Sequence, residues 1–227
     1  MRVLIWNLFH GRAVPGAGRD LLDEFCAALA GWEWDVGLLQ EVPPWWPPAL
    51  ARACDADERT APTSRNALPA LRRAIAVRLP DVIKSNGGGA NAILVRHAFA
   101  EITDHRSETL RRRPERRVCH AVQLGGGAWC ANLHAEAHGG RAPADIARAA
   151  GAMLRWANGA PVLLGGDFNV RAPVLPGWEH LGGHHVDHAF GHGVVAAAPI
   201  ERLDSRPLSD HVPLIISAVT RDPAQAG

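Results

Sequence analysis

Clusters of polar residues directly follow several short apolar runs of this chain. Glu41, Asp167 and Asp210 each supply a carboxylate in such a cluster, and Asn7 and Asn169 add neutral amide oxygens. Hard oxygen donors of this kind suit Mg²⁺ or Mn²⁺ rather than a thiolate-bound metal. Strand ends on one rim of a sheet can converge, so the sequence predicts a divalent-cation site built from distant parts of the chain. The clusters are Trp6-Asn7, Gln40-Glu41, Asn132-Leu133-His134, Gly166-Asp167-Phe168-Asn169, Val186-Asp187-His188 and Ser209-Asp210-His211.

Two histidines and a further carboxylate belong to the same clusters. His134 and His211 are suited to transferring protons or stabilising a phosphate near neutral pH. Asp187 is suited to holding one of these imidazoles in orientation. In the hydrolysis of a phosphate ester, a divalent cation neutralises charge on the non-bridging oxygens and the leaving group. A single Asp or Asn at a strand end is more often a turn residue, so the prediction depends on the whole set.

Short apolar runs predict the strands that must position these clusters. The predicted strands are 3–6, 36–39, 92–95, 118–124, 129–133, 162–164, 186–190, 194–197 and 212–219. Amphipathic spacing predicts helices over 21–29 and 146–157, and weaker patterns favour helices over 47–54 and 69–79. Strands outnumber helices and only some alternate with them. We therefore expect packed sheets with helices outside, and not a purely alternating parallel sheet.

Length and composition narrow the class of protein. A chain of 227 residues with 47% hydrophobic and 21% charged residues is expected to form one domain over 1–219, followed by a flexible tail over 220–227. The net charge of +1 does not announce a strongly basic nucleic-acid binder, although a local basic patch is compatible with it. No run approaches the roughly 20 apolar residues of a membrane-spanning helix. Four cysteines without a C-x-x-C pair, and no secretion signal, predict free thiols in a monomeric cytoplasmic protein.

The order of the clusters resembles the motif set of the endonuclease/exonuclease/phosphatase superfamily. The matching runs are V-L-I-W-N, L-L-Q-E, N-L-H, G-G-D-F-N, V-D-H and S-D-H-V-P-L, and they cover nearly the whole chain. G-D-F-N and S-D-H are specific, whereas the others are persuasive only in sequence. The resemblance implies a DNase I-like fold, an α+β arrangement of four layers (α/β/β/α). In it, two packed mixed β-sheets are flanked by helices.

The resemblance also implies a metal site for Mg²⁺ or Mn²⁺. Glu41 resembles the principal metal ligand of the family, and Asn7 resembles its neighbour. Asp210 is similar to the second acidic ligand.

The remaining matched residues resemble the family's catalytic groups. Asp167 and Asn169 match the pair that positions or deprotonates the attacking water and contacts the phosphate. Asp187 and His211 resemble a carboxylate–imidazole pair. His134 matches the histidine that contacts phosphate or protonates the leaving oxygen. Asp167 and His211 stay joint candidates for the group that takes the proton from water.

The chain departs from one branch of this family. It contains no tyrosine, whereas the abasic-site endonuclease branch has a tyrosine where N-L-H stands here. His134 therefore indicates the branches that resemble DNase I, deadenylases or phosphatases. The chain is also short for the family, which predicts reduced substrate-gripping insertions.

Two further features have a functional and a structural interpretation. The arginine run 111–117 suits phosphates along a nucleic acid, although charge runs are more often solvated. Trp45 and Trp46, just after Glu41, are suited to stacking on bases, although packing onto the core is the commoner role.

The leading hypothesis is a hydrolase of phosphodiesters with a nucleic acid or nucleotide as its substrate. One alternative is a phosphomonoesterase, or an inositol or lipid phosphate hydrolase, that uses the same site. Another is a catalytically inactive nucleic-acid-binding module on the same fold. A missing ligand would be the signature of such a module, and all the expected positions are filled.

Overall fold

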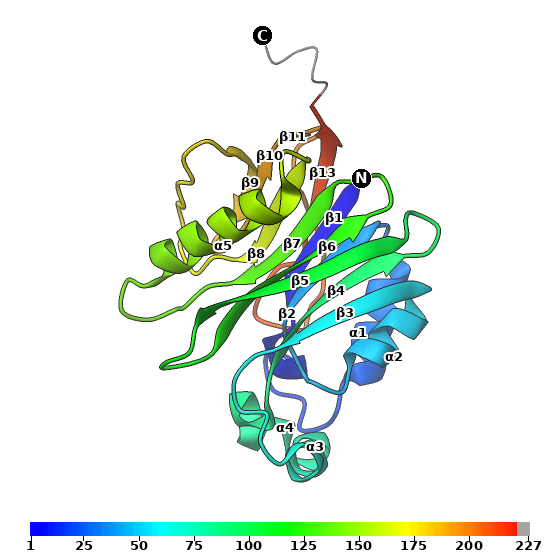
Figure 1. Cartoon of the computed structure of the whole chain (residues 1–227). Coiled ribbons are helices and arrows are strands. Elements are labelled where there is room, and N and C mark those ends of the chain that lie inside the picture. The colour runs from blue at the N-terminus through cyan, green and yellow to red at the C-terminus, as the bar shows by residue number, and fades with distance from the viewer. Residues whose placement is uncertain (222–227) are drawn as a thin grey trace.

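The computed structural model of the chain describes residues 1–221, which form two β-sheets stacked face to face with helices on the outer faces (Figure 1). The first sheet has seven strands in the order β11-β13-β1-β2-β4-β3, and β12 also pairs with β13. The second sheet has six strands in the order β5-β6-β7-β8-β10-β9. This arrangement confirms the predicted four layers.

Both sheets are mixed, because each contains one parallel pair among antiparallel ones. The first sheet comprises β1 (Arg2–Asn7), β2 (Val36–Val42), β3 (Ala56–Pro62), β4 (Ala90–Arg96), β11 (Val194–Ala196), β12 (Glu201–Arg202) and β13 (Leu214–Thr220). The second comprises β5 (Ile102–Arg111), β6 (Arg117–Leu124), β7 (Trp129–His134), β8 (Val162–Asp167), β9 (Glu179–His184) and β10 (Asp187–His192). The parallel pairs are β1 with β2 and β7 with β8. The carboxyl ends of each parallel pair therefore meet at one edge of their sheet.

The central strands are apolar because both of their faces are covered. In β1, Val3 and Ile5 belong to the cluster between the two sheets, whereas Leu4 and Trp6 face the cluster under the helices. This division follows from the two-residue period of a strand.

Three helices cover the outer faces of the sheets. The first sheet packs against α1 (Leu22–Gly31) and α2 (Pro47–Ala53), and the second against α5 (Ala142–Ala157). Two more, α3 (Pro69–Arg78) and α4 (Pro80–Ile83), project from one end of the sheets (Figure 1). None of the helices among the described residues is long and apolar enough to cross a membrane.

Each predicted strand and helix corresponds to an observed one, but four strands were not predicted: β3, β5, β9 and β12. Three of these, β3, β5 and β9, are sheet edges, and β12 is a two-residue strand. Edge strands carry polar side chains on exposed surfaces, so they lack the apolar run that reveals a buried strand. β13 extends to Thr220, and residues 222–227 of the predicted tail lie outside the described residues. All four cysteines are free.

Candidate active site

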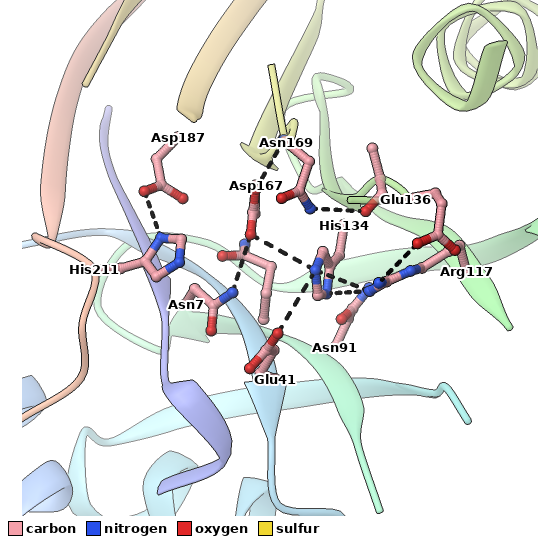
Figure 2. Close-up of polar contacts among 12 residues, drawn as sticks. Asn7, Glu41, Asn91, Arg117, His134, Glu136, Asp167, Asn169, Asp187 and His211 are labelled. Carbon is pink, nitrogen blue, oxygen red and sulfur yellow. Dashed lines mark hydrogen bonds and ion pairs between the residues drawn. The ribbon is translucent and has the colours of Figure 1, made fainter. Parts of the chain in front are cut away.

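Strands from both sheets bring the predicted site residues to one place (Figure 2). In the first sheet the parallel register pairs Asn7 with Gln40, the residue before Glu41. In the second sheet it pairs His134 with Asp167. The antiparallel partner of Asp167 on the next strand is Asp187. The strand ends therefore converge, as the sequence pattern predicted.

A hydrogen bond joins the two sheets at the centre of this cluster. Asn7 Nδ2 donates to Asp167 Oδ2 at 3.1 Å, and both side chains are buried. The other carboxylate oxygen, Oδ1, accepts the backbone N–H of Asn169 at 2.9 Å. Asn169 has a positive φ of 51° and donates its side-chain amide to the carbonyl of Ala135. Asp167 is thus fixed by donors on both of its oxygens.

Asp187 and His211 form a second pair. His211 Nδ1 donates to Asp187 Oδ2 at 2.7 Å, although the two residues lie on separate segments. Burial alone would lower the pKa of His211, but the hydrogen bond and charge of Asp187, with Asp167 and Asp210 nearby, raise it to about 9. His211 is therefore an imidazolium at neutral pH.

The loop that carries Asp210 and His211 is tied to β1. Ser209 has a positive φ of 61°, and its hydroxyl donates to the carbonyl of Asn7 at 2.6 Å. The same hydroxyl accepts the backbone N–H of His211 at 3.1 Å. Ser209 therefore sets the position of His211 relative to Asn7. In the S-D-H motif, the serine therefore has a structural role, and the aspartate and histidine are the predicted site residues.

Burial and a neighbouring carboxylate bring the pKa of Asp167 close to neutral pH. Burial raises the pKa of Asp167 to about 7, and the charge of Asp187 contributes to the rise. One ligand atom from each of Asp167, Asp187 and His211 lies within 4.8 Å of the others. Two carboxylates and an imidazolium therefore share one small, largely buried space.

Glu41 points into the site from an irregular position in β2. The pairing of β2 with β4 shifts between Leu39 and Val42, and Glu41 has a φ of 50°. A bulge of this kind re-aims a side chain, and a strained backbone conformation often marks a functional residue. Glu41 Oε2 lies 3.1 Å from His10 Nε2, and Oε1 lies 3.8 Å from His134 Nε2.

His134 lies between the two acidic groups of the opposing sheets. Its Nε2 is 3.6 Å from Asp167 Oδ2, in addition to its approach to Glu41. Burial lowers the pKa of His134 well below its ordinary value, and the charge of Arg117 adds to this effect. Arg117 Nη1 lies 2.9 Å from Nε2 and 3.1 Å from Nδ1 of the ring. His134 is therefore neutral at physiological pH in the absence of a ligand.

Arg117 is the residue of the arginine run that reaches the site. It is buried on β6, and its Nη2 lies 3.2 Å from Glu115 and 3.7 Å from Glu136. Arg111 instead pairs with Asp145 of α5. The run therefore does not act as one surface.

Two neighbouring motif residues hold the sheets together. Gln40 Nε2 donates to Asn132 Oδ1 at 2.8 Å, which links β2 of the first sheet to β7 of the second. Asn132 Nδ2 donates to the carbonyls of Leu39 and Ala92. The Q of Q-E and the N of N-L-H are thus buried structural residues. Trp46 is also structural, since it packs in the core at 5.3 Å from Phe25 between ring centroids.

Sequence reasoning missed His10, Glu136 and Arg117 as members of the site. His10 lies in a short 3-10 helix with a positive φ and touches Glu41. Glu136 follows N-L-H by two residues, so its closeness to His134 in the chain was the only available signal. Arg117 was visible only as part of a charge run.

The donors of the site fit a divalent cation. Asp210 is exposed and Glu41 is partly exposed, and among the described residues the only basic side chains within 4 Å of their carboxylates are histidines. Burial raises the pKa of Asp210, and the charge of Glu41 adds to the rise. Two accessible, mutually repelling carboxylates match the hard oxygen donors of Mg²⁺ or Mn²⁺. Asp167, Asp187 and His211 fit less well, because a protonated histidine offers no lone pair to a metal.

One protein-family model matches the chain. The model of the endonuclease/exonuclease/phosphatase family matches residues 4–211. No curated protein sequence shows a significant match to the chain.

Several solved structures share the fold. A functionally unknown conserved protein from Enterococcus faecalis V583 is 15% identical, with a TM-score of 0.73, and the match covers 97% of this chain and 100% of that one. A humanized D. rerio TDP2 is 15% identical with a TM-score of 0.68, covering 97% and 99%. A mannosyl-6-phosphatase from Bacteroides thetaiotaomicron VPI-5482 is 16% identical with a TM-score of 0.69, covering 96% and 99%.

Proposed function

The chain belongs to the endonuclease/exonuclease/phosphatase family, and on that premise we propose that it is a Mg²⁺- or Mn²⁺-dependent phosphodiesterase. Family membership establishes the coarser statement, a hydrolase of the phosphoesterase and nuclease type. The observation that carries the finer one is the position of His134. Its imidazole lies 3.8 Å from Glu41 and 3.6 Å from Asp167, between the proposed metal ligand and the proposed water-positioning group.

Glu41 and Asp210 would hold the cation, with the side-chain oxygen of Asn7 close by. When bound, the ion supplies charge neutralisation at the phosphate and at the leaving oxygen. Asn7 Oδ1 accepts the backbone N–H of Phe9, and Asn7 Nδ2 donates to Asp167. These two hydrogen bonds fix the orientation of the side-chain amide. The protein thereby orients its oxygen donors before any substrate arrives.

Asp167 would orient the attacking water and accept its proton. Both of its oxygens already receive hydrogen bonds, so the carboxylate has one orientation. A pKa near neutrality suits a general base. His211 is the less suitable acceptor, because Asp187 keeps it protonated. It would instead donate to a non-bridging phosphate oxygen.

His134 would stabilise the phosphate or the leaving oxygen. As a neutral ring, it has one N–H to donate. The guanidinium of Arg117 beside it adds positive charge where negative charge develops.

Metal-dependent turnover tests the proposal. Purified protein should hydrolyse bis(p-nitrophenyl) phosphate with Mg²⁺ or Mn²⁺ and stop when a chelator is added. Glu41→Gln should raise the metal concentration needed for half-maximal rate, whereas Glu201→Gln, at an exposed position, should not. Turnover that persists at full rate in excess chelator would refute the metal assignment.

The substrate class that we favour is a nucleic acid or nucleotide. A phosphomonoesterase is the second candidate, since one structure of the same fold is named as a mannosyl-6-phosphatase. Release of inorganic phosphate from sugar or inositol monophosphates, with DNA and RNA left intact, would favour the second candidate. We also propose that the enzyme acts as a monomer in the cytoplasm.

A further inference from the structure

A short helical arm, residues 68–84, projects from the end of the molecule at which α3 and α4 lie (Figure 1). No residue of α3 is buried. The helix therefore contributes little to the core of either sheet. Such an element needs another reason for its apolar residues.

The arm carries an exposed apolar stripe. Leu68, Leu71, Ile75, Leu79 and Val82 follow one another at spacings of three or four residues. Because α3 ends at Arg78 and Leu79 has a non-helical backbone conformation, they are spread over α3, the break after it and α4. Their exposed fractions run from 37% to 73%. Half of the large apolar side chains that are exposed in the described part of the chain lie in this arm. A gathering of this kind marks an interaction surface, whereas scattered single residues do not.

Unpaired cations accompany the stripe. Within residues 1–221, Arg73, Arg78 and Lys84 have no acidic side chain within 4 Å. Asp81 is the arm's one acidic residue, and its carboxylate accepts the backbone N–H of Gly18 in the body of the protein. The surface of the arm therefore carries both exposed apolar side chains and unpaired positive charge.

The arm also borders the candidate active site. Its last residue begins the 3-10 helix Lys84–Gly87, and Ser85 and Gly89 line a hollow together with Glu41 and His134. The last residue of the arm is therefore one residue away from this hollow.

We propose that the helical arm docks on the surface of an anionic lipid bilayer. Leucines and valines insert at the boundary of headgroups and acyl chains, while arginine and lysine reach the lipid phosphates. Each cation near an anionic leaflet adds attraction. The stripe contains no aromatic residue, whereas binding to single-stranded nucleic acid relies on aromatic stacking. The projecting shape of the arm suits a flat surface. This proposal is independent of the reaction assigned to the site.

Vesicle sedimentation tests the docking surface. The full chain should pellet with vesicles of phosphatidylglycerol and phosphatidylcholine, and far less with phosphatidylcholine alone. The double variant Leu71→Asp/Val82→Asp should lower the partition coefficient by about tenfold or more. Val174→Asp is the matched control, because Val174 is 84% exposed on a distant loop, and it should bind as the wild type does.

Charge reversal tests the contribution of the arm's cations to docking. Arg73→Glu/Arg78→Glu should lower binding by about tenfold and weaken its dependence on salt, whereas Arg155→Glu on α5 should not. The arm variants should hydrolyse a soluble diester at the wild-type rate, which separates loss of docking from loss of the proposed reaction.

Three results would overturn the proposal. One is a wild-type chain that stays in the supernatant with anionic vesicles. Another is equal pelleting of the wild type and the Leu71→Asp/Val82→Asp variant. The third is a wild-type dimer in light scattering that the same variant converts to a monomer, because the stripe would then cover a second copy.

Discussion

The side-chain amide of Asn7 donates a 3.1 Å hydrogen bond to Asp167, although 160 residues separate them in the chain. Asn7 ends a strand of the first sheet and Asp167 ends a strand of the second. The bond therefore fixes the distance between the proposed metal side and the proposed water side of the site. Shifting one sheet against the other would break it.

Asp167→Asn should separate activity from stability. Removing the proposed base should lower kcat on a soluble aryl phosphodiester by about 10²–10⁴-fold. The free energy of unfolding should fall only slightly, because the neutral amide avoids the cost of burying a charge but places an NH2 group against one of the two donors that the carboxylate accepts. Urea unfolding and steady-state kinetics measure the two effects. Asp204→Asn, at an exposed position, should change neither, and a fully active Asp167→Asn would contradict the assignment.

Asp187→Asn should change the titration of His211. In the metal-free protein, the His211 ring should titrate near pH 9 by NMR, and in the variant its pKa should be lower. Because the folded pKa is raised, the pair stabilises the fold below the unfolded pKa of about 6.5 and loses this contribution as pH rises through about 9. An unchanged His211 titration in Asp187→Asn would exclude the pairing.

His120 should make the fold sensitive to acid. It is fully buried on β6 and shares a 3.2 Å hydrogen bond with His105, and burial lowers its pKa to about 3. In the unfolded chain His120 binds a proton near pH 6.5, whereas in the folded chain it stays neutral down to about pH 3. Stability therefore falls as pH drops from about 6.5 toward about 3. The slope from this group is about 1.4 kcal/mol per pH unit at most. Urea unfolding at several pH values should show a shallower slope for His120→Gln. Equal slopes would contradict the prediction.

Asn132→Ala should destabilise the protein without touching the reacting groups directly. The substitution removes the side-chain donor to the buried carbonyls of Leu39 and Ala92, and it leaves the amide of Gln40 with only its bond to the carbonyl of Leu38. An unsatisfied buried polar group costs about 1–3 kcal/mol, so the unfolding free energy should fall by at least about 2 kcal/mol. Asn86→Ala, at a position whose side chain is exposed, should lower the unfolding free energy by less than about 0.5 kcal/mol. A loss of unfolding free energy in Asn132→Ala no greater than in this control would mean that the stability of the two sheets does not depend on the hydrogen bonds of Asn132.

Gly166→Ala should prevent Asp167 from reaching its place. A Cβ at Gly166 would lie 2.0 Å from the carbonyl oxygen of Leu133, and the φ of 139° is one that other residues rarely adopt. The neighbouring backbone must shift, so we expect a loss of more than about 3 kcal/mol together with loss of turnover. Gly126→Ala, where a Cβ would meet open space, is the control for the same change. Wild-type stability in Gly166→Ala would show that the strands at this point are not in close contact.

The sequence was most informative about the buried strands and their polar ends. An apolar run such as Val3–Trp6 can only be satisfied by cover on both faces, and the Asn7 that follows it is a buried polar residue that needs a partner. The parallel registers then place such ends side by side. The sequence therefore predicted which residues lie close together, whereas their catalytic and metal-binding roles stay predictions.

The sequence did not predict the edge strands or the supporting residues of the site, for physical reasons. β5 is polar along most of its length because one of its edges and much of its surface face water. His10 and Arg117 belong to the site through contacts that depend on a turn with positive φ and on pairing between β5, β6 and β7. No local pattern encodes those contacts.

Ser209 and β13 have a consequence for the timing of synthesis. β1 is the first strand of the described residues, yet one of its two neighbours is β13, the last strand among them. The hydroxyl that carries His211 to Asn7 lies only a few residues before that strand. A chain under synthesis therefore exposes one edge of β1 and lacks an assembled centre until β13 has been translated. The proposed site is therefore assembled only when β13 has taken its place beside β1.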